Sequence, residues 1–132
     1  MELKAGIIGK QTVVVTEEMT AKRLGSGELP VLATPQMIAL MENTAYKSVT
    51  SFLEEGQGTV GTRISVSHLA ATPVGMEVSF ETLVTEVDRK RLVFTVKAYD
   101  VCGLIGEGEH ERFIIDNERF LAKAEQKNRE KA

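Results

Sequence analysis

A single long amphipathic segment constrains the fold of this chain more than any other feature. Thr34-Pro35 is a typical helix start, because threonine caps helices and proline is favoured at the first helical position. Beyond it, apolar residues recur every three or four positions and predict a helix of about twenty residues that ends near Gly56. Such an apolar face must be buried against a partner element. It comprises Met37, Ile38, Met41, Ala45, Val49 and Phe52.

The segments on either side of this helix change to a period of two, as expected for strands whose side chains alternate between two faces. Before the helix, we expect a strand over residues 11–16 and a short helix over 17–24; a final helix begins at Asn117. Short turns join four consecutive strands, which favours an antiparallel sheet. We therefore expect an α+β fold with the sheet wrapped around the long helix, where Gly106 and Gly108 allow close approach of the helix backbone. The four strands are 59–68, 76–87, 92–99 and 105–115, with a bulge near Leu83-Val84 in the second.

Length and composition restrict the class of protein. The chain has 132 residues, of which 42% are hydrophobic and 27% charged, and these values indicate one globular domain over residues 1–132. A net charge of −3 gives no general basic field for nucleic acid, and no apolar stretch reaches the ~20 residues of a membrane span. The first residues lack the apolar core of a signal peptide, so we expect a cytoplasmic protein. A domain of this size has little interior for a catalytic cavity, which favours a site between two copies.

Two polar residues interrupt the apolar patterns. Glu42 lies in line with Ile38 and Ala45 on the helix stripe, where a carboxylate needs a partner, a shifted pKa or a route to solvent. His68 continues one strand face, which would direct its ring towards the helix. The position of Glu42 would be explained if its carboxylate reached water or paired with an arginine. That of His68 would be explained by a hydrogen bond to a backbone carbonyl. If the two side chains paired with each other, they could instead carry out general acid–base chemistry. The strand face assigned to His68 comprises Val60, Thr62, Ile64, Val66 and His68.

Four further residues have candidate roles. Thr34 either caps the helix or places its hydroxyl at the positive end of the helix dipole, roughly 12 Å along the axis from Glu42. His110 and Arg112 share an inward strand face, and a structural ion pair with Glu42 or with the C-terminal carboxylates is the simpler role for Arg112. Cys102 is predicted to be a free surface thiol, and the basic clusters at 22–23 and 89–91 to be solvated unless a phosphorylated substrate uses one. The sequence contains no GxSxG, phosphate-loop or HExxH motif and gives no support for a metal site.

Several short motifs between residues 31 and 127 carry a family resemblance. The most specific is the run from His68 to Gly75, taken together with Met41-Glu42 on the helix. The others are Val31-Leu32-Ala33-Thr34, Gly58-Thr59-Val60-Gly61-Thr62 and Ile105-Gly106-Glu107-Gly108-Glu109-His110-Glu111-Arg112. With these motifs the chain resembles the hot-dog-fold thioesterases, most closely the fluoroacetyl-CoA thioesterase type.

The resemblance implies a site at a homodimer interface, with tetramers as a further possibility, and coenzyme A as part of the substrate rather than as a cofactor. It implies catalytic roles for Thr34, Glu42 and His68. The glycine that matches Gly61 lines the acyl site in this family, and Arg112 matches an arginine that helps to hold the site together. The fluoroacetyl enzyme has a longer, phenylalanine-bearing lid before its threonine, whereas the segment 23–32 here is shorter and contains no phenylalanine. The resemblance therefore implies the chemistry and leaves the acyl group open.

Three functional hypotheses follow from these residues. The first is hydrolysis of a short acyl-CoA thioester, in which Glu42 either activates water or attacks the carbonyl itself, Thr34 orients the thioester and His68 transfers protons. The second is a non-catalytic acyl-CoA or acyl-metabolite binding module, which would not need a buried carboxylate. The third is a hydratase, which would show an aspartate and a histidine a few residues apart near the central helix.

Overall fold

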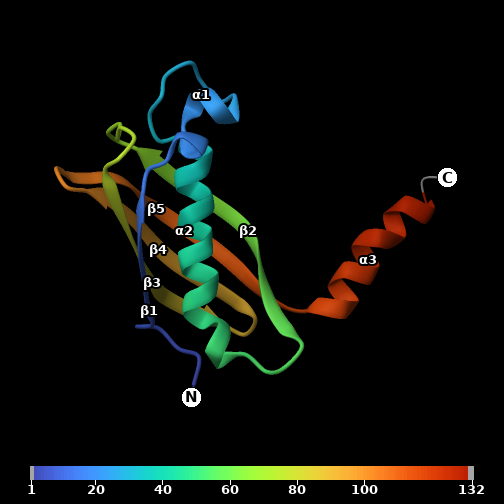
Figure 1. Ribbon diagram of the computed structural model, residues 1–132. Coiled ribbons are helices and arrows are strands. Elements are labelled where there is room, and N and C mark those ends of the chain that lie inside the picture. The colour runs from blue at the N-terminus through green and yellow to red at the C-terminus, as the bar shows by residue number, and fades with distance from the viewer. Residues whose placement is uncertain (1, 131–132) are drawn as a thin grey trace.

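The computed structural model describes residues 2–130, in which five antiparallel strands curve around one long helix (Figure 1). This arrangement confirms the expected α+β class. The strands lie in the order β1-β3-β4-β5-β2, so that β1 and β2 form the two edges of the sheet. The strands are β1 (Ile8–Val14), β2 (Gln57–His68), β3 (Glu77–Asp88), β4 (Arg91–Asp100) and β5 (Gly103–Asp116). The helices are α1 (Ala21–Leu24), α2 (Thr34–Val49) and α3 (Asn117–Glu130), with short 3-10 turns η1 (Glu17–Met19) and η2 (Thr50–Phe52).

Helix α2 crosses the concave side of the sheet and forms the core with it (Figure 1). Its buried residues are Met37, Met41, Thr44, Ala45 and Val49, so most of the expected apolar stripe is confirmed, while Ile38 is only half-buried. The inward residues of β4 at the centre of the sheet are completely buried: Leu92, Phe94, Val96 and Ala98. Burial of a side chain such as Phe94 contributes about 1.5–3 kcal/mol to folding, so this contact is the main source of stability for the helix. The helix itself ends at Val49 and η2 continues it to Phe52, so the helical segment stops before the predicted end near Gly56.

A bulge in β2 changes which residues of this strand face the helix. The pairing of β2 with β5 shifts in register between Gly61 and Arg63, so one extra residue is accommodated there. Before the bulge the inward side belongs to Thr59 and Gly61; after it, Ile64 lies opposite the buried His110. The prediction that one inward face runs unbroken from residue 60 to 68 is therefore wrong for residues 60 and 62. The bulge expected in β3 is confirmed, because its register with β4 shifts just after Val84.

Gly106 and Gly108 of β5 have different roles. A Cβ on Gly106 would lie 2.7 Å from Sδ of Met37, so this glycine makes room for the helix as expected. A Cβ on Gly108 would instead collide with the backbone of the neighbouring strand at Ser65 and Val66. The prediction that both glycines accommodate the helix is therefore wrong for Gly108, whose contact is with β2.

The segments before and after the central elements differ in how they contact the core: Leu3, Ile7 and Val13 pack against it, whereas α3 does not contribute a buried residue. The first strand begins earlier than predicted, at Ile8, and the segment predicted as one short helix divides into η1 and α1. Helix α3 extends away from the sheet past the end of β5 and has no buried residue (Figure 1). Its first turn is capped by Asp116, which accepts from the backbone N–H of Arg119. Among the described residues, no helix is both long enough and apolar enough to cross a membrane.

Candidate active site

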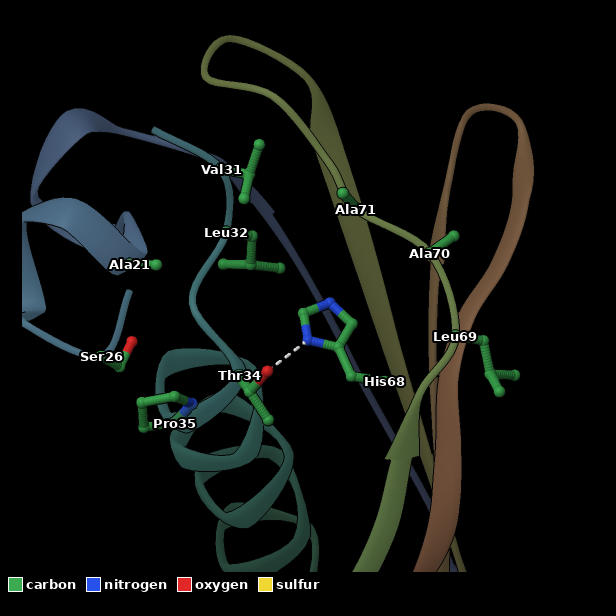
Figure 2. Close-up of a pocket in the computed structure, with 10 residues that line it drawn as sticks. All are labelled: Ala21, Ser26, Val31, Leu32, Thr34, Pro35, His68, Leu69, Ala70 and Ala71. Carbon is green, nitrogen blue, oxygen red and sulfur yellow. Dashed lines mark hydrogen bonds between the residues drawn. The ribbon is translucent and has the colours of Figure 1, made fainter. Parts of the chain in front are cut away.

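The start of α2 holds the shortest polar contact between predicted site residues. Thr34 Oγ1 and His68 Nδ1 lie 2.7 Å apart, so the first residue of the helix is hydrogen-bonded to the last residue of β2 (Figure 2). The N-cap position belongs to Ala33, and no side chain caps this end of the helix. The threonine hydroxyl is therefore bonded to the histidine rather than to the helix backbone, contrary to the simple capping explanation.

The second nitrogen of His68 has no hydrogen-bond partner. Its Nε2 is buried, and no polar atom within residues 2–130 meets it with acceptable geometry. Burial lowers the pKa of His68, and the nearby Ala70 backbone opposes this shift without making a standard hydrogen bond. A neutral imidazole with one bonded and one free nitrogen is suited to accepting or donating a proton.

A pocket of about 360 Å³ opens beside this pair. Figure 2 shows Thr34 and Pro35 on the helix at one side, His68 to Ala71 at the other, and the segment before the helix above them. The lining is largely apolar and small, which suits a short acyl group or the thioester arm of a larger molecule. It consists of Ala21, Ser26, Val31, Leu32, Thr34, Pro35, His68, Leu69, Ala70 and Ala71.

Glu42 lies further along the same helix, in a second hollow of about 290 Å³ lined by Glu42, Gly61, Thr62, Arg63, Ile64 and His110. Its side chain is 40% exposed, and its Oε2 lies 3.8 Å from Nη1 of Arg112, whose side chain is 8% exposed. Glu42 therefore both reaches solvent and pairs with an arginine, as its simpler explanation required. A contact of this length on a half-exposed carboxylate stabilises the fold little.

Gly61 lies directly against this carboxylate. A Cβ at this position would be 2.8 Å from Oε2 of Glu42 and 3.4 Å from Nη1 of Arg112. The bulge in β2 turns Gly61 inward, and the absence of a side chain leaves the carboxylate accessible.

The candidate residues thus form two groups rather than one. Thr34 and His68 are joined at the start of α2, whereas Glu42, Gly61 and Arg112 are joined near its middle. Within residues 2–130, no hydrogen bond or ion pair links Glu42 to His68, so the pairing of these two suggested by the sequence pattern does not occur within one chain.

Besides Glu42, Arg112 contacts His110, Thr59 and Tyr46: His110 was singled out from the sequence for its inward position on β5, whereas Thr59 and Tyr46 were assigned no role. Arg112 donates from Nε to the hydroxyl of Thr59 and from Nη2 to its carbonyl, and its guanidinium carbon lies 5.7 Å from the centre of the Tyr46 ring. The third contact of the guanidinium joins Nη1 of Arg112 to Nε2 of His110 at 3.1 Å. The alternation along β5 was enough to place His110 on the inward side of the sheet. Thr59 was missed because it lies on the face of β2 opposite to the one predicted to point towards the helix.

One further sequence prediction concerns the turn between β4 and β5. Cys102 is free and exposed, as predicted. Among the described residues, no group of three or more histidine, cysteine, aspartate or glutamate side chains is arranged to hold a metal ion.

Comparison with known proteins identifies relatives of the chain. The family model described as fluoroacetyl-CoA-specific thioesterase matches residues 15–118. The curated fluoroacetyl-CoA thioesterase of Streptantibioticus cattleyicolor is 42% identical over 97 residues, which cover 74% of this chain and 70% of that protein.

Solved structures agree with this result. A structure of the fluoroacetyl-CoA thioesterase superposes with a TM-score of 0.91 at 36% identity, covering 96% of this chain and 98% of that chain. A mutant of that enzyme in complex with fluoroacetate and CoA gives a TM-score of 0.85 at 34% identity, over 89% of this chain and 99% of its own. A thioesterase superfamily member from Thermus thermophilus gives a TM-score of 0.88 at 31% identity, covering 96% of this chain and 93% of its own. The chain therefore belongs to the fluoroacetyl-CoA-specific thioesterase family and is a hot-dog-fold enzyme that hydrolyses acyl-CoA thioesters.

Proposed function

We propose that this enzyme hydrolyses a short acyl-CoA thioester at a site shared by two copies of the chain, with Thr34 and His68 from one copy and Glu42 from the other. The observation that supports this most directly is the 2.7 Å contact between Thr34 Oγ1 and His68 Nδ1, beside a pocket and with His68 Nε2 left without a partner. Such a pair can bind the substrate and transfer protons.

The distance along α2 supports the contribution of a second copy. Thr34 and Glu42 are eight positions apart on one helix, which at 1.5 Å per residue is roughly 12 Å. A reacting carbonyl must lie within about 3.5 Å of the attacking group and about 3 Å of the groups that stabilise its oxygen. One chain does not satisfy both conditions, whereas two chains related by a two-fold axis would bring each Glu42 to the other chain's Thr34.

The free edge of β2 offers a surface for this pairing. This strand forms one edge of the sheet over twelve residues, from Gln57 to His68, and it carries both Gly61 and His68. A long unpaired edge is normally covered or paired. A second copy along β2 would cover it and would lie next to both halves of the site.

In the proposed reaction, water adds to the thioester carbonyl carbon and the carbon–sulfur bond breaks. Glu42 accepts a proton from the water, or attacks the carbonyl itself to form an acyl anhydride that water then cleaves. The positive end of the α2 dipole and the Thr34 hydroxyl stabilise the negative charge on the carbonyl oxygen. His68 delivers a proton to the sulfur, so the products are a free acid and the CoA thiol. Trapping of an acylated Glu42 during turnover distinguishes the two routes.

The CoA phosphates need a basic surface near the pocket. Lys22 and Arg23 follow Ala21, which lines the pocket, and both side chains are exposed. We propose that they attract the phosphates while the acyl end enters beside His68.

Mixing of inactive variants tests the shared site. Thiol release from a panel of short acyl-CoAs is expected to fall to near background for Glu42→Gln and for His68→Ala. When the two variants are mixed and their subunits exchange, about a quarter of the sites regain all three residues. Thiol release is then expected to return to about a quarter of the wild-type rate. A Lys97→Gln variant on the exposed side of β4 serves as a control that keeps full activity throughout. Activity of Glu42→Gln equal to wild type would refute the assignment, and failure of the mixture to regain activity would place all three residues in one chain.

A further inference from the structure

A polar cluster lies beside Glu42, and one of its members, His110, lines the same hollow as the carboxylate. Arg112 is held there by three contacts: Nε to Thr59 Oγ1 at 2.8 Å, Nη2 to the Thr59 carbonyl at 3.0 Å, and Nη1 to His110 Nε2 at 3.1 Å. The first two contacts fix one side of the guanidinium. The contact with His110 involves Nη1, the same nitrogen that faces Glu42.

The partners of His110 determine where its proton resides. Nδ1 lies 2.8 Å from the backbone carbonyl of Arg63, and a carbonyl only accepts, so Nδ1 carries the hydrogen. Nε2 faces a guanidinium, which only donates, so Nε2 is the acceptor. Both contacts are satisfied together only by the neutral ring with its hydrogen on Nδ1.

The surroundings of His110 favour this neutral form. The residue is 1% exposed, and its ring stacks on Phe94 with centroids 6.0 Å apart. The charged groups that face it are Arg112, Glu42 and Glu111. Burial lowers the pKa of His110 most, and the positive charge of Arg112 lowers it further, against the opposing effects of the Arg63 carbonyl and the two carboxylates.

We infer that His110 is a positioning residue for the thioesterase reaction: by accepting from Arg112 Nη1, it fixes the guanidinium group against which the Glu42 carboxylate is oriented. This inference rests on the proposed role of Glu42. The two Thr59 contacts alone would still let the planar guanidinium tilt about the line that joins Nε and Nη2, so the position of Nη1 would be less closely defined. The rigid imidazole, held by the β2 backbone on one side, removes that freedom.

Two substitutions separate this role from simple packing. His110→Leu keeps an apolar side chain against Phe94 and removes the acceptor, whereas His110→Gln supplies an amide oxygen at a similar reach. We expect His110→Leu to lower kcat by about 10- to 100-fold with little change in KM, because a small displacement of Glu42 affects the reacting geometry rather than substrate capture. His110→Gln is expected to restore most of kcat.

A core variant controls for loss of stability. Val84→Ala removes buried methyl groups from β3, far from the polar cluster in sequence, and lowers the melting temperature without touching Glu42. We expect it to keep the wild-type kcat at a temperature where both variants are folded. Equal loss of kcat in His110→Leu and Val84→Ala at matched stability, or no rescue by His110→Gln, would overturn the inference.

The tautomer of His110 gives a measurement that does not depend on catalysis. The ¹⁵N chemical shifts of the His110 ring are expected to show a protonated Nδ1 and an unprotonated Nε2 at pH 7. In an Arg112→Gln variant, which lacks the guanidinium donor, this preference is expected to weaken. A ring protonated on Nε2 or on both nitrogens at pH 7 would overturn the inference.

The failure of this inference is distinguishable from that of the proposed function. If Glu42→Gln is fully active, the proposed function fails whatever the tautomer of His110. If Glu42→Gln is inactive and His110→Leu retains wild-type kcat, only the positioning role of His110 fails.

Discussion

The substitution Gly61→Ala tests how closely the β2 backbone must approach the Glu42 carboxylate. The added methyl group would lie 2.8 Å from Oε2 of Glu42, 3.2 Å from Cε1 of His110 and 3.4 Å from Nη1 of Arg112. The closest of these atoms is the end of a flexible side chain, so the carboxylate moves by several tenths of an ångström and the backbone stays in place. A displacement of about 1 Å costs roughly 100-fold in rate, and a shift of this smaller size is expected to cost about tenfold in kcat.

Stability is expected to change much less than activity. The backbone of Gly61 lies outside the left-handed region, so alanine fits its conformation. Replacing glycine reduces the freedom of the unfolded chain and contributes about 0.5–1 kcal/mol, which offsets the weakened contact between Glu42 and Arg112. We expect the free energy of unfolding of Gly61→Ala to lie within about 1 kcal/mol of wild type.

Gly58→Ala is the matched control in the same strand. Its Cβ would lie 2.5 Å from Oδ1 of Asn117, again the end of a side chain, but one at the start of α3 and outside the site. The assay is thiol release at saturating acyl-CoA, together with urea unfolding of both variants. Wild-type kcat in Gly61→Ala would refute the reasoning, because a displaced Glu42 would then be irrelevant to the reaction; equal loss of kcat in Gly58→Ala would show a general effect on β2.

Three further predictions concern stability, pH and substrate binding. Gly108→Ala is expected to destabilise the fold by about 3 kcal/mol or more in urea unfolding, because its Cβ would meet the rigid backbone of β2; a loss as small as that of Gly61→Ala would contradict this. The pKa values of His68 and His110 are lowered from 6.5 in the folded state, so their contribution to stability is complete above pH 6.5 and is lost as the pH falls through the folded-state values. Between pH 7 and pH 5 the melting temperature should therefore fall less steeply in His110→Gln than in wild type. An unchanged dependence of the melting temperature on pH would argue against this linkage. Removing the charge of Lys22 or Arg23 is expected to raise KM for acyl-CoA by about threefold each and to leave KM for acyl-pantetheine unchanged; equal effects on both substrates would exclude a phosphate contact.

Regular alternation made the central part of the fold predictable. The inward residues of β4 follow a strict period of two, and the apolar stripe of α2 follows a helical period. The buried face of each element can therefore be predicted from its own sequence, without knowing which element packs against it. Arg112 on the inward side of β5 was placed correctly for the same reason, as was its ion pair with Glu42. The short turns after Asp88 and Asp100 fixed the antiparallel order of three strands.

The parts of the site that were predicted wrongly depend on single local events. One bulge in β2 reverses the facing of Thr59 and Gly61, and a period-two pattern contains no information about where such a bulge occurs. A pairing of His68 with Glu42 was one alternative, because both residues interrupt an apolar face, but the helix rise places the glutamate too far along α2 within one chain. Thr34 has two competing uses for one hydroxyl, and only the position of His68 at the end of β2 decides between them.

The Thr34–His68 pair and the Glu42–Arg112 pair are separated along α2, and this separation helps to explain how so small a chain accommodates catalytic residues without losing its apolar core. His68 leaves one buried nitrogen without a partner, and Glu42 is 40% exposed with a single distant cation. Both conditions are unfavourable for an isolated fold, since unpartnered buried polar groups destabilise and a half-exposed carboxylate gains little from its arginine. Their placement at the start and near the middle of α2 leaves an apolar stretch between them, in which Met37 and Met41 are buried. Pairing with a second copy would then bring the two incomplete groups together only at the interface, where substrate satisfies what the single chain leaves open.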